Sequence, residues 1–475
     1  LFLTVGARFD AHSAFGSNFN GQFYPKVSVS YIPSDSGNWS GLGPISSLQL
    51  RTAYGMAGLQ PGAFDAFTSY LALASANGAG IAPNNLGDPD LKPEVSKEFE
   101  IGFNAGLFND KFNLEFTYWD RITTDALYAR QFPLSGGFRN QQLTNVGELE
   151  ANGLEINLSG NIIRKGDLTV NAYVNAAYLQ ENVKSLGGAP PLKVGGSYPR
   201  YRNFLQEGFA PGANFGAKLA SVPSGSLPID IANGDGLPDT SQQLVAFLTG
   251  NGSYSLPTSI GTGSVLLADE DGDGDYLDHY LGKSTPDWTG AFGGSVNYKN
   301  WTLNTTFEFK AGNFVINNLT DAFRQANGAI GRNLPRSAKV ARDYATGGVD
   351  GSFTPQGDGN VRLAALDEWL NNTLALAPFS GLNTLEKADF VRWRELSLNY
   401  NITGSILDQF SLDTASIGLS GRNIAIFTSY TGVDPEINFV GRGSGSNLDQ
   451  NYGQGIAAFG WPIPTQVLLT LKVGF

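Results

Sequence analysis

The chain has 475 residues, no cysteine, only two histidines and a formal net charge of -12 at pH 7. The absence of cysteine excludes a disulfide framework, a thiolate metal site and a cysteine nucleophile. The acidic balance disfavours a nucleic-acid binder, and no segment resembles a basic stripe that neutralises phosphates, so we expect no nucleic-acid partner. Aromatic residues are 12% and charged residues only 16% of the chain, which is unlike a disordered protein.

Two observations concern a membrane. No apolar run reaches the ~18 residues that a membrane helix needs, and the start, LFLTVGARFD, lacks the basic region and long apolar core of a signal peptide. If the chain lies in a membrane, it therefore crosses as a β-barrel. Because a secreted barrel needs a signal peptide, we expect the chain to be the C-terminal part of a longer precursor.

Segments of alternating apolar and polar residues recur along the chain and predict about twelve strands. In the last of them, Val467, Leu469 and Leu471 share one face with Phe475, while the other face is mostly polar or small. Such a strand is typical of an outer-membrane barrel, with a soluble sandwich as the alternative. The predicted strands lie near 1–12, 22–33, 45–56, 95–108, 112–118, 144–162, 168–176, 287–298, 301–314, 387–402, 413–430 and 467–475.

The connections between these segments alternate in length. Tight turns are predicted at Asn109-Asp110, from Arg164 to Gly166 and at Lys299-Asn300; long links are predicted at 57–94, 180–286, 315–386 and 431–463. Bacterial barrels alternate short periplasmic turns with long external loops, whereas a sandwich has no reason to do so. The link 13–21 is brief where a long one is expected. The fold class predicted is an all-β, antiparallel transmembrane barrel.

Several motifs, in order along the chain, resemble those of the SusC/RagA branch of TonB-dependent outer-membrane transporters. They are GARFDAHSAFG (6–16), FYPKVSVSY (23–31), LQLRTAYGMAG (48–58), LKPEVSKEFEIGF (91–103), NVGELEANGLEI (145–156), STPDWTGAFGGSVNYKNW (284–301), ADFVRWRELSLNY (388–400) and GRNIAIFTSYTGVDPE (421–436). Each motif alone is weak, and most also have a structural explanation as loop-to-strand boundaries. Their order makes the resemblance specific.

The resemblance implies a barrel of about 22 strands closed by an N-terminal plug. Residues 1–475 would be the C-terminal part of that one barrel domain, contributing about 12 strands, with 180–286 and 315–386 as long extracellular loops. It also implies active import of an oligosaccharide or peptide in the outer membrane of a Gram-negative bacterium. The implied partners are outer-membrane lipid, a SusD-like surface lipoprotein and the TonB energy-coupling complex, which binds a region preceding this chain. Since a half-barrel leaves open strand edges in lipid, we expect the other half to belong to the same polypeptide.

One acidic segment, DEDGDGDYLDHY, has the spacing of a calcium loop. Aspartates occupy loop positions one, three and five, and Gly274 occupies position six, where calcium loops need a sharp turn, but Tyr280 occupies the position where an EF-hand has glutamate. The candidate calcium ligands are Asp269, Asp271, Asp273, Asp275 and Asp278; a weaker candidate set with poorer spacing is Asp230, Asn233, Asp235 and Asp239. The alternative is a solvated acidic turn.

Catalysis has little support in the sequence. His12 and His279 are the only histidines, and neither lies in an HExxH or triad-like setting. We therefore expect no enzyme. A passive porin and a structural or adhesive surface barrel remain as alternatives to an importer, and the substrate cannot be identified from the sequence.

Overall fold

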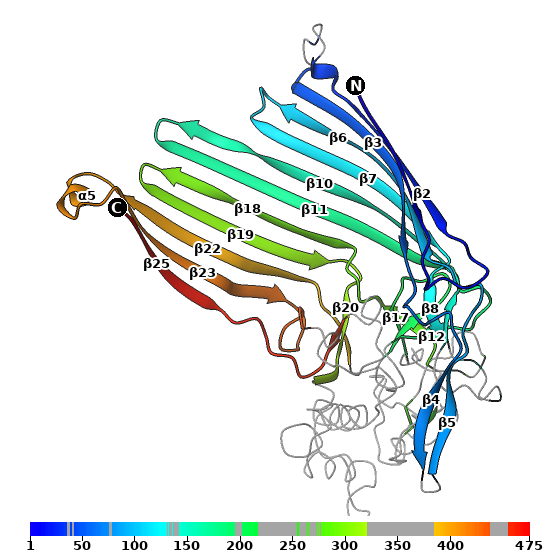
Figure 1. The fold of residues 1–475 in the computed structure, drawn as a ribbon. Coiled ribbons are helices and arrows are strands. Elements are labelled where there is room, and N and C mark those ends of the chain that lie inside the picture. Colours follow the sequence, from blue (N-terminus) through cyan, green and yellow to red (C-terminus); the bar gives the residue numbers. More distant parts are fainter. Residues whose placement is uncertain are drawn as a thin grey trace, which may run out of the picture.

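The computed structural model describes residues 1–35, 39, 42–75, 78–130, 132, 135, 142–194, 202–216, 254–255, 264–265, 273, 275, 277–320, 384–437 and 455–475. Its main feature is one curved antiparallel sheet of twelve strands, with smaller sheets gathered at one end of it (Figure 1). Among the described residues, no helix is long and apolar enough to cross a membrane.

The strands of the large sheet lie in the order in which they follow one another in the chain, so neighbours are joined as in a meander. Each neighbouring pair is antiparallel. The strands are β1 (Phe2–Asp10), β2 (Gln22–Tyr31), β3 (Ile45–Leu59), β6 (Glu94–Leu107), β7 (Phe112–Thr124), β10 (Glu148–Lys165), β11 (Leu168–Ser185), β18 (Trp288–Tyr298), β19 (Trp301–Ala311), β22 (Phe390–Ile402), β23 (Thr414–Thr428) and β25 (Gln466–Gly474).

All twelve predicted strands are present. The described strands β1 and β25 form the two edges of the sheet and do not pair with each other. The prediction of an all-β antiparallel fold with about twelve strands is therefore confirmed for this chain, while the strand number of a complete barrel stays a prediction.

One end of the sheet, which we call the turn end, carries the tight connections. Lys299 and Asn300 join β18 to β19, and Lys299 adopts a left-handed φ of 51°. The turn between β10 and β11 consists of Gly166, with φ 55°, and Asp167. It begins two residues after the predicted start at Arg164 and ends one residue after the predicted end at Gly166, because β10 continues to Lys165. Glycine tolerates this conformation without the steric cost that a Cβ adds.

Two further connections at the turn end contain short helical turns. The 3-10 helix η1 (Pro33–Asp35) lies between β2 and β3, and the five-residue helix α5 (Ser405–Gln409) lies between β22 and β23. Both chain termini lie at this end of the sheet (Figure 1).

The opposite end, the mouth end, carries the long links and the small sheets. Strand β11 continues to Ser185, so the long link predicted from residue 180 begins after that residue. The small sheets are the hairpins β4 (Ser69–Ser75) with β5 (Gly78–Asn85), β8 (Leu127–Arg130) with β9 (Gln142–Asn145) and β15 (Tyr254–Ser255) with β16 (Ser264–Val265); the sheet of β12 (Leu192–Lys193), β13 (Asn203–Leu205), β14 (Ala213–Gly216) and β17 (His279–Gly282); and the sheet of β21 (Leu385–Lys387), β20 (Val315–Asn318) and β24 (Ile456–Ala457).

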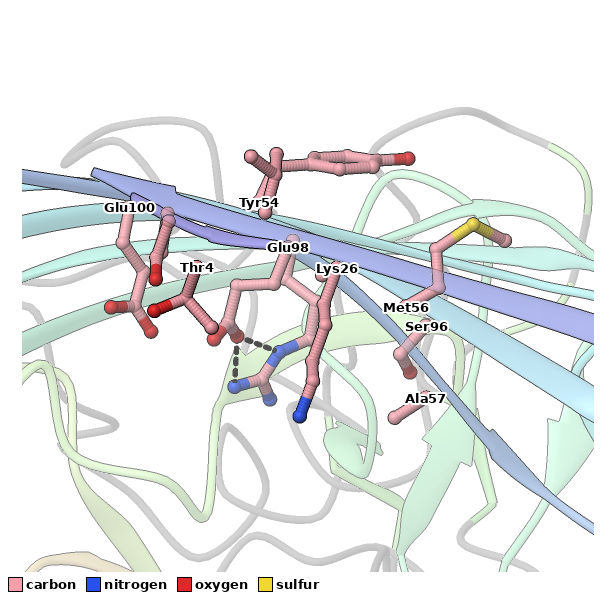
Figure 2. Close-up of a pocket in the computed structure, with 13 residues that line it drawn as sticks. Thr4, Lys26, Tyr54, Met56, Ala57, Ser96, Glu98 and Glu100 are labelled. Carbon is pink, nitrogen blue, oxygen red and sulfur yellow. Dashed lines mark hydrogen bonds and ion pairs between the residues drawn. The ribbon is translucent and has the colours of Figure 1, made fainter. Parts of the chain in front are cut away.

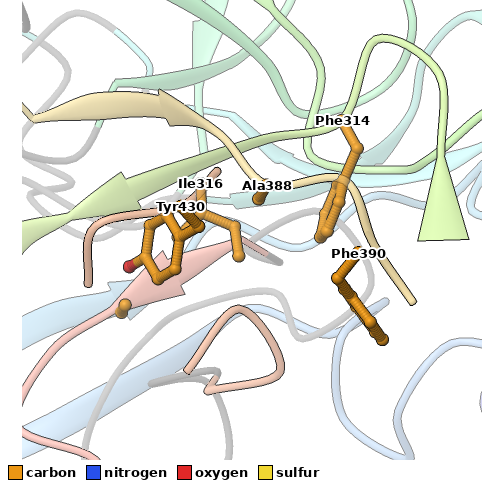
Figure 3. Packing of buried hydrophobic residues seen from close by; sticks show 6 residues of the cluster. Phe314, Ile316, Ala388, Phe390 and Tyr430 are labelled. Atoms are coloured by element: carbon orange, nitrogen blue, oxygen red, sulfur yellow. The ribbon is translucent and has the colours of Figure 1, made fainter. Parts of the chain in front are cut away.

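Apolar packing among the described residues is concentrated at the mouth end. Figure 3 shows one cluster, in which Phe314, Ile316, Ala388, Phe390 and Tyr430 come from three different stretches of the chain. Each is at most 6% exposed. Since full burial of a large apolar side chain stabilises a fold by about 1.5–3 kcal/mol, this cluster fixes the links that follow β19 and β23 to the start of β22.

Candidate functional site: two faces of a membrane sheet

One face of the large sheet is apolar across its strands. Leu303, Leu398, Leu419 and Leu469 lie directly opposite one another on four consecutive strands, and they are 38%, 40%, 52% and 73% exposed. A second row is formed by Leu158, Val174, Phe292 and Phe307. An exposed apolar surface of this extent is incompatible with water, so this face contacts lipid.

Aromatic pairs lie at both ends of the apolar face. Tyr178 and Trp288 are 5.0 Å apart at the mouth end, and Trp301 and Tyr400 are 4.6 Å apart at the turn end, measured between ring centroids. Tyrosine and tryptophan prefer the boundary between lipid and water. Strand β18 has 11 residues, counting its two aromatic ends, Trp288 and Tyr298. With about 3.3 Å per residue and a tilt of about 45°, it spans roughly 25 Å, the height of a barrel's apolar band.

The other face is polar, and its charges gather toward the mouth end. A groove of about 620 Å³ there is bordered by four charged residues from three strands: Lys26 on β2, Glu98 and Glu100 on β6, and Arg121 on β7. Arg121 donates from Nε to Glu98 Oε2 over 2.6 Å. Tyr54, which borders the same groove, projects to the opposite side of the sheet (Figure 2). The groove is therefore part of a wall with charges of both signs.

A second groove, of about 340 Å³, lies beside it and continues the charged wall. Its border includes Arg51, Glu115 and Glu155. Arg51 donates from Nη2 to Thr117 Oγ1 over 2.5 Å, which directs the guanidinium along the wall. The two glutamates add negative charge next to this cation. The charged and polar side chains of this wall suit polar or charged groups better than an apolar ligand.

Toward the turn end the polar face becomes uncharged. Asn161, Asn171, Ser295, Asn304 and Ser397 lie directly opposite one another on five consecutive strands. Asn171 donates to Ser295 Oγ over 3.1 Å, and Asn304 donates to Ser397 Oγ over 3.2 Å. These neutral side chains satisfy one another, so this part of the wall offers exchangeable hydrogen bonds and no fixed charge.

At the mouth end, Arg202 precedes β13 and links it to β14 and to the residues before β17. This buried guanidinium donates from Nε to the Phe215 carbonyl over 2.6 Å and from Nη2 to the Leu277 carbonyl over 3.0 Å. Burial, and then the charge of Arg202, lower the pKa of Lys193 to about 8. Burial also lowers the pKa of Arg202, while Asp275 opposes that change. The small sheet therefore carries positive charge in a partly dry environment.

The candidate calcium residues lie only partly within the described structure. Asp269, Asp271 and the whole weaker set, Asp230, Asn233, Asp235 and Asp239, fall outside the described residues. Asp273 Oδ1 accepts the Asp275 N–H over 2.6 Å, and Asp275 Oδ1 accepts the Leu277 N–H over 2.9 Å. Asp278 lies beside His279, with 3.5 Å between Oδ1 and Nδ1. In the described part of the chain, no three acidic or histidine side chains are grouped as metal ligands, and calcium stays a prediction.

A charged network at the mouth end was not anticipated from the sequence. Arg392 and Arg394 on β22 form ion pairs with Asp434 and Glu436, which are about 40 positions further along the chain. The only available signal was that these residues belong to two of the quoted motifs, ADFVRWRELSLNY and GRNIAIFTSYTGVDPE. Alternation within one strand does not show which distant segment will cover a charge.

Comparison with known proteins identifies the family. The model of the family described as TonB dependent receptor-like, beta-barrel matches residues 1–241, just over half of the chain. The chain belongs to this family of outer-membrane β-barrels. The predicted SusC/RagA-like resemblance and outer-membrane location are thereby confirmed.

Individual relatives agree with this assignment. TonB-dependent receptor P3 of Formosa agariphila is 25% identical over 465 residues, which are 95% of this chain and 42% of that protein. TonB-dependent receptor SusC of Bacteroides thetaiotaomicron is 24% identical over 197 residues, which are 39% of this chain and 19% of that protein. The chain thus spans less than half the length of these curated relatives.

Among solved structures, the fold is similar to that of the RagAB peptide transporter. The TM-score is 0.69 at 20% sequence identity, and the match covers 100% of this chain and 46% of the matched chain. The RagAB peptide importer in its closed-closed state gives a TM-score of 0.70, also at 20% identity. At this identity the likeness concerns the fold.

Proposed function

We propose that the chain forms one side of the barrel of a TonB-dependent transporter that imports a bulky nutrient, an oligosaccharide or a peptide, across the outer membrane. The observation that carries the proposal is the contrast between its two faces. A continuous apolar face suits lipid, and the opposite face presents Lys26, Arg51, Arg121 and several glutamates beside uncharged amides. Such a wall suits a hydrated, polar cargo.

The proposal includes partners. Since relatives of this chain are TonB-dependent receptors, the driving force would come from the TonB complex acting on a region outside this chain. A SusD-like surface lipoprotein would dock at the mouth end. Support for this comes from the long links between β11 and β18 and between β19 and β22, because long loops on a compact scaffold usually serve binding.

The open edges of the sheet belong to the same proposal. Strands β1 and β25 would pair with strands outside this chain, since unpaired backbone groups in lipid cost several kcal/mol each. This chain would contribute binding and passage of the cargo, with no catalytic step.

A passive porin and a structural or adhesive barrel are the competing functions. Energy dependence separates them from the importer. The experiment measures uptake of a fluorescent peptide digest of casein and of fluorescent maltodextrins by cells that carry the full-length protein, with and without a working TonB complex. The importer requires uptake of one probe class that disappears without TonB. Uptake that persists without TonB would support a porin, and uptake of neither probe would leave the structural barrel as the better explanation.

A further inference from the structure

We propose that Arg392 and Arg394 are positioning residues, which hold the last long link against the polar wall and make it a fixed part of the mouth. The link is described at residues 431–437 and 455–465, which we call the anchored link. Its consequence for transport depends on the proposed function, whereas the anchoring itself does not.

A β-bulge aims both arginines at the same face. Trp393 lies on the apolar face, where its ring stacks on Phe307 with 5.4 Å between centroids. Arg392 lies opposite Glu308 on the polar face. The pairing of β22 with β19 shifts by one residue at Arg394, and this extra residue also reaches Glu308, with 2.5 Å between Nε and Oε2. A bulge commonly redirects a side chain in this way.

The anchored link covers these charges. Arg392 contacts Asp434 through Nη2 and Glu436 through Nε, both over 2.5 Å. The side chains of Arg392 and Asp434 are only 5% and 4% exposed, and that of Glu436 is 12% exposed. Arg394 also pairs with Glu436. While the link stays in place, loss of any one of these partners would leave a buried charge uncompensated, which is strongly unfavourable.

Asp434 also ties the two ends of the link together. Its Oδ1 accepts the Glu436 N–H over 2.9 Å, and its Oδ2 accepts the Ile463 N–H over 3.3 Å. One buried carboxylate therefore joins β22, the start of the link and the residues before β25.

A second bulge secures the far end of the link. Asn423 on β23 has a left-handed φ of 51° and lies where the pairing with β22 shifts. Its Oδ1 accepts from Arg394 Nη1 over 3.3 Å, and its Nδ2 donates to the Pro464 carbonyl over 3.1 Å. Thr465 donates from Oγ1 to the Asn423 carbonyl over 2.7 Å. The two bulges thus hold both described parts of the link, near Asp434 and near Pro464. If the chain is part of an importer, movement that admits cargo would occur in other loops.

The experiment is a double-mutant cycle on the full-length protein, with hydrogen exchange as the measurement. Arg392→Met, Asp434→Asn and the double variant are compared with Arg422→Met. The control residue pairs with Glu395 over 3.8 Å, and the two side chains are 54% and 40% exposed, so its loss should have little effect. Arg392→Met should speed exchange of the Glu436 and Ile463 amides by about a hundredfold, because it leaves buried carboxylates uncompensated.

Two features distinguish anchoring from a general loss of stability. Exchange along β25 should stay unchanged in Arg392→Met, and the double variant should exchange less rapidly than the sum of the two single effects predicts. Arg392→Lys, which keeps the charge, should restore part of the protection. The proposal would be overturned if the Glu436 and Ile463 amides exchanged equally fast in Arg392→Met and Arg422→Met. It would also be overturned if the effects of Arg392→Met and Asp434→Asn were additive and extended over β25. If neither the wild type nor any variant imported a fluorescent probe, that result would count against the proposed function. It would leave the anchoring result intact.

Discussion

At the scale of single residues, Lys193 carries a charge that its surroundings disfavour. Its pKa is lowered to about 8, so its protonated form is less stable in the folded protein than in the unfolded chain. Below pH 8 both states are protonated and the full penalty applies. As the pH rises from about 8 toward the ordinary lysine value of about 10.4, the folded state loses its proton first and the penalty disappears.

We therefore expect Lys193→Met to stabilise the sheet of β12, β13, β14 and β17 at pH 7, with an advantage that shrinks between about pH 8 and pH 10.4. Hydrogen exchange of that sheet at several pH values measures it. Lysine-specific acetylation gives an independent test, since about a quarter of Lys193 should be neutral and reactive at pH 7.5. Exposed Lys111 serves as the control lysine. A pH-independent advantage would contradict the assigned cause.

At Gly153 on β10, which lies on the polar wall, the backbone of β11 and the ring of Trp119 leave no room for a side chain. A Cβ there would lie 2.4 Å from the Tyr178 carbonyl oxygen and 2.7 Å from the Trp119 ring. Gly153→Ala should therefore destabilise the barrel by about 1–3 kcal/mol, through overpacking. Gly55→Ala is the matched control, because its Cβ would meet only Lys26 Cβ at 3.9 Å. The midpoint of urea unfolding measures both, and equal midpoints would show that the neighbours of Gly153 can yield.

At the scale of the strand, side-chain alternation separates lipid from the polar wall. Val174 and Asn175 are adjacent on β11 and point to opposite faces; Val174 lies opposite Phe292, and Asn175 Oδ1 accepts the Ala291 N–H over 2.8 Å. Val174→Arg should cost about 2–4 kcal/mol, since it places a charge in the apolar band. Asn175→Arg should cost only about 1 kcal/mol, the value of one hydrogen bond. Unfolding of the full-length protein in lipid vesicles measures the difference, and similar costs would show that the faces are wrongly assigned.

The same alternation explains which elements could be predicted. Every strand of the large sheet has one apolar face, so its period of two is visible in the sequence, as in Val467, Leu469 and Leu471. The ends of strands are harder to predict from alternation: β11 continues through Glu181 to Ser185, where polar residues on both faces leave no pattern. The short strands at the mouth end are held by tertiary contacts, for example the parallel pairing of Asn317 with Ile456. Local sequence contains no signal for such contacts.

The candidate site was predictable to a similar degree. A polar wall follows from alternation alone, because residues between lipid-facing positions must point inward. Which charged residues form ion pairs depends on the strand register and on which loops cover the wall. The bulge at Arg394 and the return of Asp434 onto β22 depend on both, so the sequence indicated these residues as motifs without their partners.

At the scale of the whole molecule, the two sheet edges decide how this chain can exist in a bilayer. Strands β1 and β25 have nine residues each, and about every second residue of an edge strand turns its N–H and C=O groups away from the sheet. If each unsatisfied group costs several kcal/mol in lipid, the two edges together cost on the order of tens of kcal/mol. Domain stabilities of about 5–15 kcal/mol cannot offset this. The sheet therefore requires neighbours on both sides.

A comparison of the full-length protein with the 475-residue chain alone tests this requirement. The full-length protein should migrate as a heat-modifiable barrel in detergent gels and protect the outer amides of β1 and β25 from hydrogen exchange. The chain alone should do neither, because its edges are unpaired in this structure. Barrels of twelve strands are physically possible. If the chain alone became heat-modifiable with protected edges, β1 would have closed onto β25, and the requirement for strands from outside the chain would be wrong.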